Sequence, residues 1–171
     1  MAKNNLVEWS DRYRIGIPLI DEQHKKLIDM TNTLYTGCLE GDRAARIYFL
    51  KTIHDAVDYV RFHFSTEEKL LERIKYPDLA AHKKEHEDFA REIISQVQAF
   101  QMGKAFVPNV FVRYLRDWVL THIAVSDKLY AAYLLELKKQ GVLFNLAIKA
   151  EYAAMRIRRW LGRAPVYGRD P

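Results

Sequence analysis

Residues 62–89 read FHFSTEEKLLERIKYPDLAAHKKEHEDF, and this stretch decides the fold. Two helix-forming segments flank the Tyr-Pro-Asp turn at residues 76–78, where proline disfavours a helical conformation for the residue before it. Metal-binding side chains recur in both segments at a spacing of four residues, which stacks them on one helix face. The pairs are His63 with Glu67 and His82 with His86. The stretch therefore predicts a helical hairpin that presents these side chains on inward faces.

Apolar residues recur at helical spacing in four segments of the chain. These segments run from about residue 19 to 38, 44 to 74, 79 to 101 and 109 to 140. Turn-forming residues separate them, and Pro108 suits the first turn of the last segment. No strand-like alternation is present. Long helices joined by short loops predict an all-α fold, an antiparallel up-down-up-down four-helix bundle over residues 1–140.

The composition fits a single globular domain. The 171 residues are 49% hydrophobic and 29% charged, and no apolar run is long enough for a membrane span. The N-terminus lacks the apolar core of a secretory signal, and the single cysteine, Cys38, excludes an internal disulfide framework. We therefore expect a cytoplasmic protein.

Residues 141–171 form a basic C-terminal extension of the predicted bundle. Six of their side chains are basic and two are acidic, so they account for most of the net charge of +5. Apolar residues recur at helical spacing, which predicts an extra helical segment that packs on the bundle or on a second copy. A basic amphipathic segment can also dock to a membrane surface or a protein partner. Nucleic-acid binding is not expected, because the body of the chain is nearly neutral.

Each predicted helix also carries at least one metal-binding side chain on its apolar side. The first contributes His24, and the last contributes His122 and Asp127. A single histidine on an apolar face is usually a hydrogen-bonded core residue. Seven such groups facing one core would be very costly to bury without partners, and a metal centre would satisfy them all. His54 lies half a turn away from the face of His63, so we expect it on the surface.

The spacing of His122 and Asp127 is unusual for two residues that share a site. Five residues place them about 140° apart on a regular helix. They can meet at one metal pair either by flanking it or through a local i→i+5 bulge, which tends to occur at functional sites.

These motifs resemble the hemerythrin family. The resemblance rests on LIDEQHKKLI around His24, HFSTEE from His63, YPDLAAHKKEH up to His86 and HIAVSD from His122, and it extends over about residues 7–137. It implies two non-haem iron ions and reversible O2 binding. By resemblance, one iron is bound by His82, His86 and His122, the other by His24 and His63, and Glu67 and Asp127 bridge them.

A count of ligands agrees with O2 binding. Two six-coordinate irons that share five histidines, two bridging carboxylates and one bridging oxide or hydroxide keep one position open, on the iron with two histidines. Histidine-rich sites suit Fe(II). By resemblance, Trp118 and Ile123 line the O2 pocket. Ala124 is smaller than the aliphatic residue expected there, which predicts a more open pocket and faster autoxidation.

The same residues are compatible with other functions. His82 to His86 matches the HxxEH pattern of inverted zinc proteases, but Glu85 is expected to point to solvent, which argues against a protease. A di-iron oxidase or peroxidase, O2, NO or redox sensing, and iron handling are the alternatives to an oxygen carrier, storage or delivery protein. We expect O2 to be the ligand. We expect neither a catalytic residue nor enzyme activity.

Overall fold

The computed structural model describes residues 5–102 and 107–140, without the side chains of residue 42 and residues 51–55. Its helices are η1 (Asp11–Tyr13), α1 (Pro18–Leu39), α2 (Asp42–Arg73), α3 (Leu79–Gln101), α4 (Pro108–His122), η2 (Ile123–Asp127) and α5 (Lys128–Lys139). The part of the chain so described contains no strand. The all-α prediction is confirmed, and the predicted helix boundaries agree to within about two residues, which is the ordinary uncertainty of helix ends.

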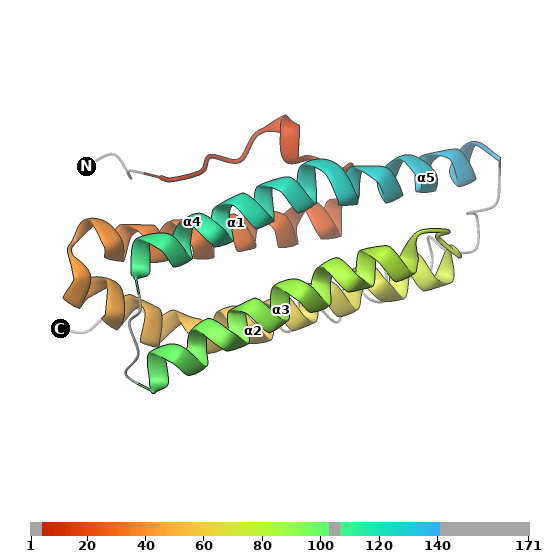
Figure 1. The fold of residues 1–171 in the computed structure, drawn as a ribbon. Coiled ribbons are helices and arrows are strands. Elements are labelled where there is room, and N and C mark those ends of the chain that lie inside the picture. The colour runs from red at the N-terminus through yellow and green to blue at the C-terminus, as the bar shows by residue number, and fades with distance from the viewer. Residues whose placement is uncertain (1–4, 103–106, 141–171) are drawn as a thin grey trace. The chain divides into compact units, whose positions relative to one another are not determined.

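The long helices pack as an antiparallel bundle. In Figure 1, α1 and α4 lie side by side in one layer, and α2 and α3 lie in the other. Short connections reverse the chain between successive helices. Residues up to Ala132 make up one compact unit, and Tyr133 begins a second one, of which only the end of α5 is described. The predicted extension, residues 141–171, lies outside the described residues, as does the side chain of His54.

Local sequence explains where the helices begin and end. Pro18 and Pro108 occupy the first helical positions of α1 and α4, where the missing N–H leaves no hydrogen bond unmade. Gly41 has a φ of +98° between α1 and α2, a conformation that favours glycine. After α2, Lys75 adopts a left-handed φ of 53°, and the N–H of Tyr76 donates to the carbonyl of Leu71 at 2.9 Å. This tight turn places α3 antiparallel to α2.

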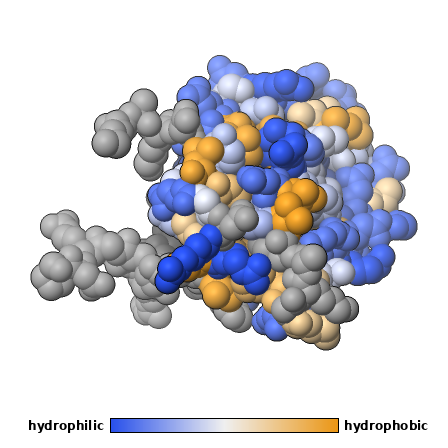
Figure 2. Space-filling model, turned by 60° about the vertical axis from the view of Figure 1, so that its left-hand side comes forward, coloured by the Kyte–Doolittle hydropathy of each residue, from blue (hydrophilic) through white to orange (hydrophobic). Residues whose placement is uncertain are grey.

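The apolar faces of the helices bury two clusters of side chains. One is centred on Phe49, Phe64 and Phe89, and the other on Leu27, Val119 and Ile123. Hydrophilic residues predominate on the face drawn in Figure 2, with hydrophobic ones scattered between them. This distribution is typical of amphipathic helices around a common core.

The segment before α1 is held against the bundle by hydrogen bonds that the sequence analysis did not anticipate. The backbone of Val7 forms two hydrogen bonds with the side-chain amide of Asn32, at 3.0 and 2.8 Å. The N–H groups of Ile15 and Gly16 donate to the buried carboxylate of Asp21 at 2.8 and 3.1 Å.

No described helix has the length and hydropathy needed to cross a membrane.

Candidate metal centre

The structure buries all seven side chains that the sequence analysis selected as metal ligands. Their exposed fractions lie between 0% and 4%. His24 comes from α1, His63 and Glu67 from α2, His82 and His86 from α3, His122 from the end of α4 and Asp127 from the end of η2. Each layer of the bundle therefore contributes to one internal site.

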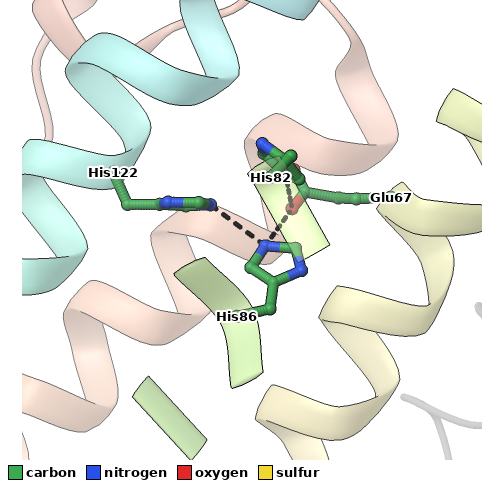
Figure 3. Close-up of side chains that lie close together, drawn as sticks. All are labelled: Glu67, His82, His86 and His122. Atoms are coloured by element: carbon green, nitrogen blue, oxygen red, sulfur yellow. Dashed lines mark hydrogen bonds and ion pairs between the residues drawn. The ribbon is translucent and has the colours of Figure 1, made fainter. Parts of the chain in front are cut away.

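Three of the histidines gather with Glu67 (Figure 3). One ligand atom from each of these four residues lies within 4.8 Å of all the others. Nε2 of His86 is 3.0 Å from Nε2 of His122 and 3.4 Å from Oε2 of Glu67. Nε2 of His82 is 3.7 Å from the same carboxylate oxygen. We call His82, His86 and His122 the three-histidine group.

The remaining histidines, His24 and His63, form the two-histidine group, also with Glu67. Nε2 of His24 is 3.7 Å from Oε1 of Glu67, and Nε2 of His63 is 3.6 Å from Oε2. Asp127 faces both groups as well, because Oδ2 is 3.1 Å from Nε2 of His24 while Oδ1 is 3.2 Å from Nε2 of His122. Both carboxylates therefore stand between the two groups.

The π-helical turn η2 brings Asp127 into the site. A regular α-helix would place Asp127 well away from the face of His122, but η2 (Ile123–Asp127) is π-helical and has an i→i+5 register. The extra residue in this turn brings the two side chains to the same side. Of the two arrangements that the sequence permitted, the local bulge is the one found.

A second layer of polar side chains orients the histidine rings. Nδ1 of His86 is 3.0 Å from Oε1 of Glu68, and Nδ1 of His122 is 2.8 Å from Oε2 of Glu85. Nδ1 of His63 is 2.9 Å from the amide oxygen of Gln23. Since a carboxylate or amide oxygen only accepts, each of these rings carries its proton on Nδ1 and turns the lone pair of Nε2 inward.

The inward-facing atoms fit metal ions better than they fit one another. Nε2 of His24, Nε2 of His82, Oε2 of Glu67 and both carboxylate oxygens of Asp127 are buried and lack a hydrogen-bond partner among the described residues. Leaving so many buried acceptors unpaired would be costly. Cations placed between converging imidazole and carboxylate lone pairs would satisfy all of them. The donor set thus fits a pair of metal ions.

Burial and neighbouring charges shift the pKa values of the ligands. Burial lowers the pKa of His63 to about 3, so this ring is neutral and available to bind a metal. Burial opposes ionisation of Glu67, but the surrounding histidines, His63 first, hold its pKa well below the usual range. The pKa of Asp127 is raised by burial and by the charge of Glu67. Two carboxylates this close to one another favour a cation between them.

Aromatic side chains cover the three-histidine group. The ring of Phe64 stacks on His86 with centroids 3.7 Å apart, and Trp118 stacks on His122 at 4.4 Å. Phe64 and Trp118 also line an apolar cavity of about 40 Å³. Ile123 is 1% exposed and packs in the core cluster with Val119, and it does not line this cavity. Its place in an O2 pocket stays a prediction.

The second layer was not predicted from the sequence. Glu85 is exposed, as expected, but it also belongs to this second layer. The Glu85 side chain is 47% exposed, yet its carboxylate accepts hydrogen bonds from His122 and from Ser126 Oγ at 2.6 Å. The hydrogen bond to His122 comes first among the causes that lower the pKa of Glu85 to about 2. Helical spacing could not reveal this contact, because it joins residues 37 positions apart.

The chain matches the model of the hemerythrin HHE cation-binding domain over residues 15–134. The chain belongs to the hemerythrin family. Its relatives include bacteriohemerythrins from Stenotrophomonas maltophilia, 36% identical over 74% of this chain and 80% of that protein, and from Methylococcus capsulatus, 33% identical over 73% and 94%. The crystal structure of wild-type hemerythrin superposes with a TM-score of 0.68 at 33% identity, covering 74% of this chain and 96% of the other. Cation binding, as the name of the family model states it, agrees with the buried histidine and carboxylate cluster.

Proposed function

We propose that this chain binds O2 reversibly at a non-haem di-iron centre and acts in oxygen carriage, storage or delivery. The observation that carries the proposal is the placement of Glu67 and Asp127, each of which faces both histidine groups from a fully buried position. Two metal ions held by the two groups would share both carboxylates. The proposal agrees with the names of the relatives, which are bacteriohemerythrins and a hemerythrin.

The seven side chains would divide between the two ions. His82, His86 and His122 would hold one iron, His24 and His63 would hold the other, and Glu67 and Asp127 would bridge them. When bound, an iron pair supplies electrons and an open coordination position for O2. The open position would fall at the two-histidine group, since this group offers one ligand fewer.

The protein's own contribution is to keep the site dry and to hold the rings still. Phe64 and Trp118 cover His86 and His122, and Phe89 stacks on Trp118 with centroids 3.9 Å apart. The cavity of about 40 Å³ beside them is lined mostly by apolar side chains and has room for a very small apolar molecule. Excluding water limits proton supply, and limited proton supply favours release of O2 over its further reduction.

The test is an anaerobic optical titration of the Fe(II)-loaded protein with O2, followed by removal of the O2. Reversible binding predicts charge-transfer bands that appear on oxygenation and disappear on deoxygenation. Bands that decay irreversibly to an oxidised di-iron spectrum would leave the metal centre intact but contradict oxygen carriage. That result would move the function towards an oxidase, a peroxidase or a redox sensor.

A further inference from the structure

The two histidine groups differ in the side chains that stand behind them. In the three-histidine group, His86 and His122 each donate Nδ1–H to a carboxylate, Glu68 at 3.0 Å and Glu85 at 2.8 Å. In the two-histidine group, His63 donates to the neutral amide of Gln23 at 2.9 Å. Nδ1 of His24 is buried and has no hydrogen-bond partner in the described part of the chain. Among the described residues, carboxylates therefore accept hydrogen bonds from outer ring nitrogens in the three-histidine group but not in the two-histidine group.

Both carboxylates have a polar neighbour outside the site, and that of Glu85 is fixed by a hydrogen bond. Ser126 Oγ donates to Oε2 of Glu85 at 2.6 Å, and Nζ of Lys83 lies 3.9 Å from Oε2 of Glu68. The side chains of Glu68 and Glu85 are 27% and 47% exposed, whereas the rings that they contact are almost fully buried. Water therefore solvates the carboxylates of Glu68 and Glu85, while their negative charge acts on the buried histidine rings that they contact.

A carboxylate that accepts from Nδ1–H makes the imidazole a more basic ligand. Such outer partners typically change metal affinity by about 10- to 100-fold. A neutral amide fixes the ring orientation but gives a weaker electrostatic effect. The difference between the groups is therefore one of charge as well as of ligand number.

We propose that Glu68 and Glu85 are positioning residues that make the two metal positions unequal, so that the three-histidine group fills first and loses its ion last. This inference rests on the proposed two-metal centre. The order in which the two positions fill is then set by Glu68 and Glu85, two side chains that do not bind metal themselves. The weaker, last-filled position is then the one proposed to bind O2.

The order of filling is measured by titrating the full-length, metal-free protein with Zn²⁺ and following the ring ¹⁵N shifts of each histidine by NMR. We expect His86 and His122 to shift during the first equivalent, and His24 and His63 during the second. Competition with a chromophoric chelator gives the affinity of each step. Both readouts are independent of O2 binding.

Three variants separate the effect of charge from that of ligand number. The double variant E68Q/E85Q keeps every metal ligand and should lower the affinity of the first step at least about 10-fold. The variant Q23E places a carboxylate behind His63 and should strengthen the second step by a similar factor. Glu87 is exposed on the same helix, α3, as Glu85, so E87Q tests the effect of losing a nearby surface charge and should change neither step.

The possible outcomes distinguish this inference from the proposed function. Two Zn²⁺ ions that bind with equal affinity, or a first step that is unchanged in E68Q/E85Q, would overturn the inequality and leave the two-metal centre standing. Failure to bind a second ion at the two-histidine group would overturn both. Circular dichroism confirms that each variant folds, and the gain expected for Q23E does not depend on a loss of stability.

Discussion

The hydroxyl of Tyr130 donates a hydrogen bond of 2.5 Å to Oε1 of Glu67, and both side chains are fully buried. Hydrogen bonds from a hydroxyl to a carboxylate are short and strong. Burial is the main reason that the pKa of Tyr130 is well above its usual range, so the phenol keeps its proton and remains a donor. The hydrogen bond thereby fixes the orientation of the Glu67 carboxylate, whose Oε1 also faces His24 while Oε2 faces the other histidines.

Replacing Tyr130 with phenylalanine should weaken the centre. The variant Y130F keeps the ring but leaves a buried carboxylate oxygen without its donor, which costs about 1–3 kcal/mol. We expect lower unfolding free energy of the metal-free protein and faster metal loss to a chelator. The control is Y35F, because Tyr35 packs against the hydrophobic cluster that contains Phe49, and the hydroxyl that binds Glu67 is that of Tyr130. Equal metal loss in Y130F and Y35F would contradict this role for the hydroxyl.

The metal-free protein should be most stable near pH 6.5. The pKa of His63 falls to about 3 on folding through burial, so the unfolded chain binds more protons below pH 6.5 and stability declines as the pH falls. For His24, burial is outweighed by Asp127 and Glu67, which raise the pKa to about 9. Protonated His24 therefore makes its full contribution to the free energy of unfolding below pH 6.5, and this contribution is lost as the pH rises through 9.

Urea unfolding of the metal-free protein between about pH 5 and pH 9.5 measures this dependence. The variant H63Q removes the group responsible for the acid limb and should flatten it, while the alkaline limb remains. A stability that rises steadily across the whole range would show that the His24 contribution is absent.

Gly37 should tolerate alanine only when Tyr48 is replaced by glycine. A Cβ at Gly37 would lie 2.8 Å from Cβ, Cγ and Cδ2 of Tyr48 on the neighbouring helix α2. Overpacking of this kind costs about 1–3 kcal/mol, against a gain of about 1 kcal/mol in helix propensity. G37A should therefore destabilise the protein in its natural background.

The same substitution should stabilise the protein in the Y48G background, by about 1 kcal/mol, because glycine at position 48 has no Cβ in the way and only the gain in helix propensity remains. A double-mutant cycle from urea unfolding measures the coupling. If G37A has the same effect in both backgrounds, the two helices do not meet closely at this point.

Trp118 should protect the centre as well as stabilise it. Trp118 stacks on both His122 and Phe89, so W118A removes a large core contact and should lower the unfolding free energy by about 3 kcal/mol. It should also admit water and speed the irreversible oxidation of the iron-loaded protein, measured from the decay of the oxygenated spectrum. The control W9A alters a tryptophan in the segment before α1 and should leave the rate of oxidation unchanged.

Some of the candidate site could be predicted from individual residues. His63 with Glu67 and His82 with His86 share helix faces at a spacing of four, so their approach follows from helix geometry alone. The spacing of five between His122 and Asp127 indicated either of two arrangements, and only the packed structure shows that η2 is π-helical. The contacts of Gln23, Glu68 and Glu85 with the histidines could not be predicted, because each joins two different helices and helix periodicity describes one helix at a time.

The amino-acid sequence by itself determined the helices, their order and the seven inward-facing metal-binding groups, because each depends on local spacing and on the cost of burying polar side chains. Only the tertiary structure decided which histidines stand together, which carboxylates face both groups and which rings carry a charged partner. These relationships join residues from different helices, at sequence separations from 18 between Glu68 and His86 to 63 between Glu67 and Tyr130. Helix periodicity describes one face of one helix, whereas the rotation and depth of each helix in the bundle are set by the side chains of all the others.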